Sequence, residues 1–426
     1  MRDGPPRTDE WYPEIVSWNT TEACNLKCGH CYLSAGRRGS DELSSEEGLS
    51  LIDQLADAGT KMVILTGGEP LMRRDIDELA QYASSREMMA VIGTNGTLLT
   101  LSRARELKEA GVAGVAISLD SLSPEKHDDF RGVAGAWEGA LQGIRNCVAE
   151  GLPVMVQMSV LPWNYTEVVD MMEFAHKEDA TSFNLYFLVC TGRGERLSDI
   201  TPQQYEDVLA TLVEAQERYP QMMVRARCAP QIIRMASQME SPLLASAGCL
   251  AARRYCRITP SGEVTPCPYL PLTGGSVRER PFKDIWRDSQ DFRRLRNESP
   301  AGRCGTCDFR QSCGGCRARA FAATADLFAE DPWCAYEPPE SRCPTVEMKP
   351  IWTTEAEERL QRIPPFIRSR VKVGVERFAE RNHESEITPA VLTATLEGMG
   401  RQVPFRRPAS VSQSQGAFDE GASDDG

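Results

Sequence analysis

Residues 24–31 read Cys24-Asn-Leu-Lys-Cys28-Gly-His30-Cys31, so three cysteines share one short loop. Three thiolates on such a loop suit a cubane iron–sulfur cluster, and they leave one of its irons without a cysteine ligand. A zinc site would need a fourth donor, and His30 lies between two of the cysteines, where it reaches the same metal poorly. The spacing therefore favours an iron–sulfur cluster with one open iron, and zinc is the alternative.

Short apolar segments rich in β-branched or aromatic residues accompany this loop, and the first of them precedes it. They cover residues 15–18, 62–65, 90–93, 112–119, 154–160 and 183–189. Because most show little polar alternation, they are typical of parallel strands that are buried on both faces and joined by crossover helices. One such helix is expected over 44–58, where Ser44 and Glu47 form a capping box. The pattern predicts an α/β fold, a partial (β/α)6 TIM-like barrel with catalytic groups at the carboxyl ends of its strands.

The chain has 426 residues, more than one hydrophobic core holds, so several domains are expected. Residues 350–402 read as a small helical domain, in which Thr354 and Glu357 predict a helix start and Pro364-Pro365 separates two helices. The predicted divisions are a barrel over 13–220, a cysteine-rich extension over 221–345, the helical domain over 350–402 and a disordered acidic tail over 403–426.

Composition narrows the class of protein further. With 41% hydrophobic and 26% charged residues the chain is typical of a globular protein. No apolar run approaches the ~20 residues of a membrane-spanning helix, and residues 1–10 lack a secretory core, so a cytoplasmic location is expected. A net charge of −13 disfavours nucleic acid and anionic membranes as partners. In a reducing cytosol, 15 cysteines indicate metal binding rather than disulfides.

The first cysteine run, in its place after a first strand, resembles the defining motif of the radical SAM superfamily. The resemblance implies that Cys24, Cys28 and Cys31 hold a catalytic 4Fe–4S cluster whose open iron binds S-adenosyl-L-methionine. Reductive cleavage of that cofactor would yield a 5′-deoxyadenosyl radical, with the electron coming from a donor such as a ferredoxin or flavodoxin.

Further matches to this superfamily lie at later strand ends. Gly67-Gly68-Glu69-Pro70 resembles the motif that receives the methionine amino group, where glycine permits close approach and a carboxylate accepts from an ammonium. Arg131 is a candidate partner for the cofactor's carboxylate. His30 and Tyr32 are candidates to pack on its adenine. The positions that resemble ribose and carboxylate contacts are Asn95, Ser118 and Asp120. Taken singly, each of these side chains is equally consistent with a cap or a turn.

The remaining cysteines of the 221–345 region resemble the SPASM extension of radical SAM enzymes, which carries auxiliary clusters. The resemblance implies one 4Fe–4S cluster on Cys249, Cys256, Cys267 and Cys316, and another on Cys304, Cys307, Cys313 and Cys334. Only two residues separate Cys313 from Cys316, where the common pattern has three, which leaves the place of Cys316 in this partition open. Some related enzymes keep only one auxiliary cluster, so one or two are expected. The alternative is a pair of four-cysteine zinc sites. The cysteines left as packing residues are Cys147, Cys190, Cys228 and Cys343.

Three segments bear on the substrate. Residues 188–195, 313–320 and 329–334 resemble the radical SAM enzymes of haem and haem d1 biosynthesis, and the resemblance runs from about Pro13 to Pro339. It implies a tetrapyrrole substrate and oxidative decarboxylation or removal of its propionates. Because such a substrate carries several carboxylates, its candidate partners are Arg193, Arg317 and Arg319.

Residues 352–400 resemble the small carboxyl-terminal domain of light-independent protochlorophyllide reductase, which adds a second hint toward a tetrapyrrole. The alternative enzyme is a SPASM-type peptide or protein maturase that oxidises or cross-links a side chain, and the non-enzyme alternative is a zinc-stabilised binding protein. His127 and His176 are possible iron ligands or proton donors, although each is more often a surface or cap residue.

Overall fold

The computed structural model describes residues 11–197, 199–241, 248–338, 350–363, 365–381, 384 and 386–400. The tail predicted over 403–426 and Cys343 lie outside the described residues. Among the described helices, none has both the length and the apolar character needed to cross a lipid bilayer.

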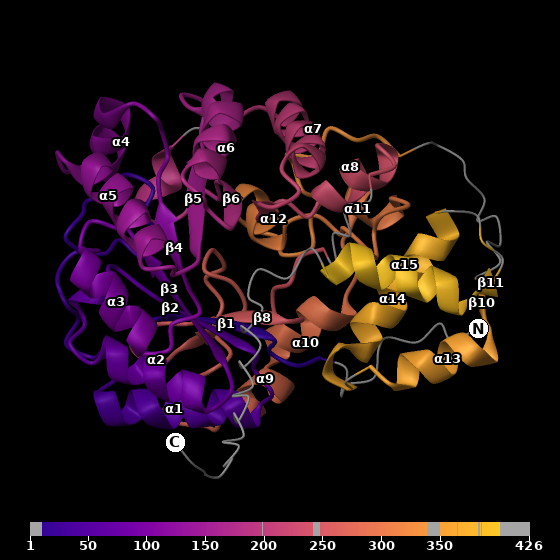
Figure 1. Ribbon diagram of the computed structural model, residues 1–426, viewed down its shortest axis with the longest axis horizontal. Helices are drawn as coiled ribbons and strands as arrows, with labels where there is room; N and C mark the ends of the chain where they lie inside the picture. Colours follow the sequence, from indigo (N-terminus) through magenta and orange to yellow (C-terminus); the bar gives the residue numbers. More distant parts are fainter. Residues whose placement is uncertain are drawn as a thin grey trace, which may run out of the picture.

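A nine-stranded sheet with the order β7-β6-β5-β4-β3-β2-β1-β8-β9 forms the centre of the molecule (Figure 1). Every neighbouring pair is parallel except β8 and β9. The strands are β1 (Ile15–Asn19), β2 (Met62–Thr66), β3 (Met89–Thr94), β4 (Gly114–Ser118), β5 (Val154–Val160), β6 (Ser182–Phe187), β7 (Met223–Arg227), β8 (Tyr255–Ile258) and β9 (Val264–Thr265). The first six are the predicted strands, so the sequence prediction of a partial barrel is confirmed.

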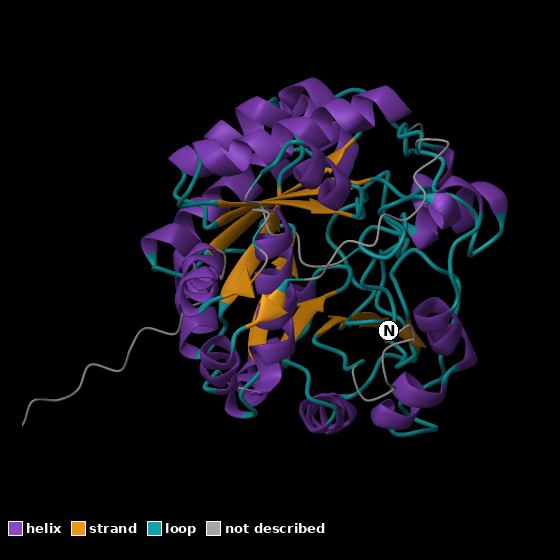
Figure 2. Cartoon of the chain, turned by 90° about the vertical axis from the view of Figure 1, so that its right-hand side faces the viewer, coloured by secondary structure: helices purple, strands orange, loops and turns teal. Residues whose placement is uncertain are grey.

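Helices cover the outside of the curved sheet, and loops of the cysteine-rich region lie across its open side (Figure 2). The crossover helices are α1 (Ser45–Asp57), α2 (Ile76–Ser85), α3 (Leu101–Glu109), α4 (Pro124–Arg131), α5 (Ala136–Ala149), α6 (Val168–Lys177) and α7 (Pro202–Arg218). The predicted capping box at the start of α1 is present, with Ser44 Oγ accepting from Glu47 N at 3.2 Å and Glu47 Oε2 accepting from Ser44 N at 2.8 Å.

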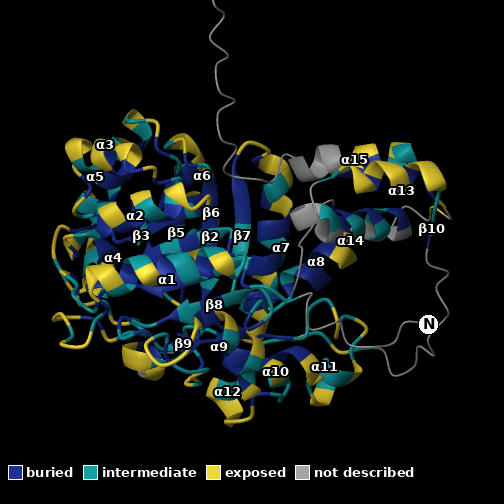
Figure 3. Cartoon of the chain, turned by 90° about the horizontal axis from the view of Figure 1, so that it is seen from below, coloured by how far each residue is buried: buried dark blue, intermediate teal, exposed yellow. Residues whose placement is uncertain are grey.

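Strand alternation divides the side chains between two faces of this sheet. Val16 and Trp18 of β1 point outward into the main apolar core, and a Cβ on Gly48 of α1 would lie only 2.8 Å from the Trp18 ring. The alternate residues, such as Ser17 and Asn19, point into the barrel. Figure 3 shows buried strands beneath helices whose outer surfaces are exposed. The main core therefore lies between sheet and helices, and the inner face carries polar groups together with a small apolar cluster of Val91, Ala116 and Met155.

Three strands of the sheet were not predicted. β7 lies beyond residue 220, the predicted end of the barrel, and β8 and β9 belong to the cysteine-rich region. Arginines alternate with apolar residues along β7, and β8 is only four residues long, so neither resembles the apolar runs of the first six strands. β8 pairs in parallel with β1, which joins the extension to the barrel through backbone hydrogen bonds.

The helices beyond the barrel are shorter. They are α8 (Ile232–Gln238), α9 (Phe282–Asp288), α10 (Gln290–Asn297), α11 (Gly302–Thr306) and α12 (Arg317–Thr324). They lie among loops rather than in regular layers, as expected of a region with few long apolar periods.

The carboxyl-terminal helices form their own group (Figure 1). This group contains β10 (Ile351–Trp352), α13 (Thr354–Gln361), α14 (Pro365–Arg381), β11 (Glu386–Ile387) and α15 (Pro389–Gly400), with a separate apolar core. The predicted helix start was wrong by one residue. Thr353, not Thr354, has the extended backbone of an N-cap, and its hydroxyl accepts from Ala356 N at 3.3 Å.

Candidate functional site

The loop with the first three cysteines leaves the carboxyl end of β1 and is fixed by backbone hydrogen bonds on two sides. Lys27 N donates to Arg131 O at 3.0 Å and Gly29 N to Phe130 O at 3.0 Å, which ties the loop to the end of α4. Cys24 N donates to Gly36 O at 2.9 Å, closing the loop at its other end. All three cysteines, Cys24, Cys28 and Cys31, are half-buried and free.

Burial raises the pKa of the Cys24 thiol to about 11, and the negative charges of Glu69 and the other two cysteines act in the same direction. A thiolate here therefore needs a compensating cation, which the irons of a cluster would supply.

The glycines after β2 bring a second loop against this one. Gly68 N donates to Thr21 O and Glu69 N to Ala23 O, both at 2.7 Å. A Cβ on Gly68 would lie 2.2 Å from Ala23 O, and Gly67 has φ +143° with a Cβ position 2.5 Å from Thr21 O. Glycine is therefore required at both positions because this loop packs directly against the backbone that leads into the cysteine loop.

Replacing Gly68 with Ala should separate these two loops, because the new Cβ would clash with backbone atoms that cannot move aside cheaply. We expect a cost of about 1–3 kcal/mol, seen as a lower thermal unfolding midpoint and less iron per chain in anaerobically purified protein. Gly29→Ala is the matched control, since a Cβ there meets nothing within 4 Å. Equal behaviour of the two variants would contradict this interpretation of the contact.

Glu69 is completely buried, and its carboxylate is held by three donors. Oε1 accepts from Thr94 Oγ1 at 2.8 Å and from Leu71 N at 3.0 Å, and Oε2 accepts from Asn95 N at 2.9 Å. Burial raises the pKa of Glu69, and these hydrogen bonds oppose the rise. Asn95 in turn donates from Nδ2 to Asn25 Oδ1 at 2.8 Å. The predicted positions after β2 and β3 therefore form one network with the cysteine loop.

Asp120 and Arg131 form a buried ion pair beside the same loop. Arg131 donates to Asp120 Oδ2 from Nε at 2.7 Å and from Nη2 at 2.5 Å, and its Nη1 lies 3.8 Å from Cys28 Sγ. Ser159 N donates to Asp120 Oδ1 at 2.9 Å. Burial lowers the pKa of Arg131, but the charges of Asp120 and Cys28 outweigh it and the net pKa is raised. Ser118 ends β4 just before this pair and is half-buried on the inner face.

The aromatic candidates beside the loop have protein partners. His30 stacks on Phe130 with ring centroids 4.2 Å apart, and burial lowers its pKa to about 3. The Tyr32 hydroxyl accepts from Asn19 Nδ2 at 2.9 Å, and its ring meets Tyr269 edge-on at 5.4 Å. The contact of either ring with adenine stays a prediction.

Neither of the other two predicted histidines lies among the cysteines. His127 Nδ1 accepts from Asp120 N at 3.2 Å, and burial lowers the pKa of this imidazole to about 4. His176 is on α6 and its ring lies 5.1 Å from that of Tyr219. Both fit the structural alternative better than a role as iron ligand.

The three arginines predicted to meet substrate carboxylates have protein partners instead. Arg193 donates to Cys28 O and Ala35 O, both at 2.9 Å, so it clamps the cysteine loop. Arg317 is buried and donates to backbone carbonyls, and Arg319 is buried against Asp331 at 3.2 Å. These partners could not be predicted, because the position of an arginine in the sequence does not show which carbonyl groups surround its guanidinium.

The barrel interior carries other arginines that sequence reasoning missed. The register pairs Tyr186 of β6 with Arg227 of β7, and Asn184 with Arg225. Arg257 of β8 points inward as well, donating to Asn19 Oδ1 at 2.5 Å and lying 5.5 Å from the Tyr32 ring centroid. The only sequence signal for these arginines was their alternation with apolar residues, and it falls on β7 and β8, which were not predicted as strands. The inner face at β6, β7 and β8 thus carries cationic and phenolic groups.

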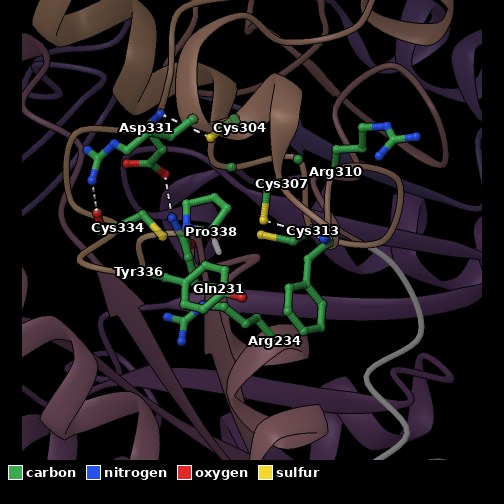
Figure 4. Close-up of a pocket in the computed structure, with 14 residues that line it drawn as sticks. Gln231, Arg234, Cys304, Cys307, Arg310, Cys313, Asp331, Cys334, Tyr336 and Pro338 are labelled. Carbon is green, nitrogen blue, oxygen red and sulfur yellow. Dashed lines mark hydrogen bonds between the residues drawn. The ribbon is translucent and has the colours of Figure 1, made fainter. Parts of the chain in front are cut away.

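Four of the predicted auxiliary ligands surround one cavity (Figure 4). This cavity contains about 410 Å³ of space between atoms, part of it open to solvent, and Asp331 and Arg234 also line it. Its cysteines are Cys304, Cys307, Cys313 and Cys334. Burial raises the pKa of Cys313 to about 12, so these thiolates also call for a compensating cation.

The other predicted ligand set, Cys249, Cys256, Cys267 and Cys316, does not lie together on one face of the sheet. Cys256 is completely buried in β8 and pairs in register with Val16, so it points to the outer apolar core. Burial raises the pKa of Cys267, and negative charge on Cys228, Cys249 and Cys316 raises it further, whereas the pKa of Cys256 is affected only by burial and by Arg296. The sequence prediction did not recognise β8, and so it could not assign Cys256 to a face.

The donor sets fit iron–sulfur clusters in chemistry. Thiolates are the ligands such clusters take, and two groups of cysteines, on the loop after β1 and around the cavity of Figure 4, meet this condition. Within the described residues, no three His, Cys, Asp or Glu side chains converge closely enough to hold a single metal ion.

Comparison with known proteins agrees with this arrangement. Residues 18–175 match the model of the radical SAM superfamily, residues 249–308 match that of an iron–sulfur cluster-binding domain, and residues 352–395 match that of the proto-chlorophyllide reductase 57 kD subunit. The AdoMet-dependent heme synthase of Methanosarcina barkeri is 37% identical over 340 residues, which cover 76% of this chain and 97% of that protein.

Two further proteins are similar to this chain at lower sequence identity. The mycofactocin maturase MftC of Mycobacterium tuberculosis is 32% identical over 332 residues, covering 76% of this chain and 83% of the maturase. The crystal structure of Streptococcus suis SuiB bound to S-adenosylmethionine has a TM-score of 0.64 at 16% identity, with coverage of 76% and 78% of the two chains, and it shows the fold alone. The cofactors of this enzyme are therefore iron–sulfur clusters and S-adenosyl-L-methionine, and the chain belongs to the radical SAM superfamily, in the SPASM-containing group that includes the AdoMet-dependent heme synthases.

Proposed function

We propose that this enzyme modifies a tetrapyrrole by oxidative decarboxylation of its propionate side chains. The observation that carries the proposal is the 37% identity to an AdoMet-dependent heme synthase over 97% of that protein's length. A peptide or protein maturase is less supported, because the mycofactocin maturase is less similar and is matched over less of its length.

In this proposal Cys24, Cys28 and Cys31 hold the catalytic cluster. Glu69 and its glycine loop, with Asn95 and Ser118, form the wall against which S-adenosyl-L-methionine lies, and Asp120 and Arg131 complete that wall. When bound, the clusters and S-adenosyl-L-methionine supply a 5′-deoxyadenosyl radical and a one-electron acceptor. We further propose that a ferredoxin or flavodoxin provides the reducing electron, and that the enzyme works in the cytoplasm.

The substrate chemistry balances without an additional oxidant. Loss of one hydrogen atom from the propionate carbon next to the ring leaves a carbon radical beside the CH₂–carboxylate group. The hydrogen atom goes to the 5′-deoxyadenosyl radical. Loss of CO₂, with one electron passing to an auxiliary cluster, then leaves a vinyl group, and this electron offsets the one that cleavage of S-adenosyl-L-methionine consumes. The protein must hold the carboxylate so that this hydrogen faces the radical and water stays out.

The arginines of the barrel interior support a substrate rich in carboxylates. Arg225 and Arg227 lie on the inner face of the edge strand β7, and Arg257 lies on that of β8 near the other end of the strand order. Within the described residues, the buried Nε of Arg227 and the buried Oδ1 of Asn184 have no hydrogen-bond partner. A guanidinium in such a place matches a carboxylate bidentately.

The test is incubation of the anaerobically purified, cluster-loaded enzyme with reductant, S-adenosyl-L-methionine and iron-coproporphyrin III. We expect 5′-deoxyadenosine and a product lighter by about 46 mass units per converted propionate, the mass of CO₂ plus two hydrogens. The methyl ester of the same porphyrin, which lacks carboxylates for the arginines, is the matched control and should remain unchanged.

Failure with every carboxylated porphyrin, together with loss of hydrogen from a peptide encoded near this enzyme, would replace the proposal with the maturase alternative. The variant Arg227→Met should raise the KM for iron-coproporphyrin III while the catalytic cluster is retained, because the side chain lies on β7 and not on the loop of Cys24, Cys28 and Cys31.

A further inference from the structure

The second auxiliary site needs a fourth cysteine, because Cys256 faces away from it. Its strand partner Val16 packs in the outer core, and Tyr255 and Arg257, the residues on either side of Cys256, are the ones that point inward. The guanidinium nearest to Cys256 is that of Arg296, which donates to Ala252 O at 2.6 Å and Trp286 O at 2.7 Å. Cys256 is therefore enclosed between β8 and the α9–α10 segment.

Cys228 directly follows β7, where a left-handed backbone ends the alternation of the strand. Its backbone has φ +58°, a conformation that non-glycine residues adopt only when their surroundings hold them. Arg319 Nη2 donates to Cys228 O at 2.9 Å, and Arg319 stands in the first turn of α12, whose N-cap is Cys316. This bond brings the end of β7 to the start of α12.

Cys249 is brought to the same place from another direction. A Cβ on the preceding residue, Gly248, would lie 2.2 Å from Cys313 O, so the two backbones touch there. A cavity beside this contact is lined by Cys249 together with Gly315 and Arg317, the neighbours of Cys316 on either side. Three cysteines from distant parts of the sequence thus approach the start of α12.

The fourth cysteine, Cys267, is brought to the inner side by its neighbour Pro268, whose O accepts from Nη1 of the inward-pointing Arg257 at 3.5 Å, and the electrostatic neighbourhood of the thiols agrees with this geometry. Burial raises the pKa of Cys267, and negative charge on Cys228, Cys249 and Cys316 raises it further. Negative charge on Cys316 and Cys249 likewise adds to the burial that raises the pKa of Cys228. Cys256 contributes to neither group and responds only to burial and to Arg296.

We propose that Cys228, together with Cys249, Cys267 and Cys316, holds the second auxiliary 4Fe–4S cluster, and that Cys256 is a packing residue. The cluster then connects the last strand of the barrel to the cysteine-rich extension. Tyr269, two residues after Cys267, meets the ring of Tyr32, which follows Cys31 of the catalytic loop. The inference rests on the cofactors of the family and is independent of the substrate proposed above.

The experiment compares Cys228→Ser with Cys256→Ser in the full-length, anaerobically reconstituted protein. Cys256 is completely buried and Cys228 is half-buried, so loss of packing alone would affect Cys256→Ser at least as much as Cys228→Ser. The readouts are iron and sulfide per chain and the electron paramagnetic resonance spectrum after reduction, with and without S-adenosyl-L-methionine. The catalytic cluster is recognised because its signal responds to that cofactor.

For Cys228→Ser we expect the loss of one to four of the ~12 irons of three clusters and a changed auxiliary signal, while the cofactor-sensitive signal is retained. For Cys256→Ser we expect unchanged iron and an unchanged spectrum. Loss of iron in Cys256→Ser, or full iron and an unchanged spectrum in Cys228→Ser, would overturn the assignment. Should Cys228→Ser not fold, the Cys256→Ser result still decides, because iron loss there assigns the fourth ligand to Cys256.

Discussion

Changing Cys24, Cys28 and Cys31 together to Ala should abolish 5′-deoxyadenosine formation and remove about four irons per chain. The three thiols share the loop after β1, and the described structure places no other cysteine on that loop. Loss of this cluster removes the site where S-adenosyl-L-methionine binds, so cleavage of that cofactor should fall to the rate without enzyme. The auxiliary sites have their own cysteines, so the remaining irons should stay bound. Iron analysis and chromatographic detection of 5′-deoxyadenosine measure the two effects.

Cys147→Ala is the matched control for this triple variant. Cys147 is completely buried in α5, and burial alone raises its pKa to about 12, as expected of a thiol that only packs. Iron content and cofactor cleavage should both match those of the unaltered enzyme. Retention of cleavage in the triple variant would refute the assignment of these three cysteines to the catalytic cluster.

The sequence was most informative where one local pattern determines the structure. The six apolar runs became β1 to β6, because a strand buried on both faces must be apolar along its whole length. The motifs after these strands then had to meet at one end of the sheet, and Glu69, Asn95 and the cysteine loop do lie in one hydrogen-bond network.

The sequence was least informative where a residue's role depends on strand pairing. β7 and β8 carry arginines and tyrosines because their inner faces line the barrel, so they lack the apolar signature that identifies the other strands. Without β8, the outward direction of Cys256 could not be foreseen, and without β7, neither could the place of Cys228. The partners of Arg193, Arg317 and Arg319 are mostly backbone carbonyls, which no residue pattern reveals.

Replacing Arg131 with Met should destabilise the protein strongly, by about 3–5 kcal/mol, because it leaves the Asp120 carboxylate buried without its cation. Asp120 is completely buried, and the side chain of Arg131 is 8% exposed. Arg103→Met is the matched control, since its partner Asp77 is 41% exposed and such surface pairs contribute only ~0–1 kcal/mol. Thermal unfolding midpoints of the two anaerobic holoproteins measure the difference.

The direction of the pH dependence distinguishes an unpaired charge from simple loss of packing. Burial raises the pKa of Asp120, but Arg131 outweighs it and holds the net pKa below its usual value, so in the unaltered protein this stabilisation is lost as pH falls through that low value. In Arg131→Met burial remains, opposed by the hydrogen bond from Ser159 N and by His30 and His127, whose own pKa values are lowered to about 3 and about 4, so the pKa of Asp120 should rise. Stability of the variant should then improve toward mildly acidic pH, where the carboxylate takes up a proton. The double variant Asp120→Asn, Arg131→Met should recover part of the lost stability at neutral pH. If the deficit of the single variant is constant with pH, and the double variant recovers nothing, then Arg131 acts through packing and through its contact with Cys28 rather than by neutralising Asp120.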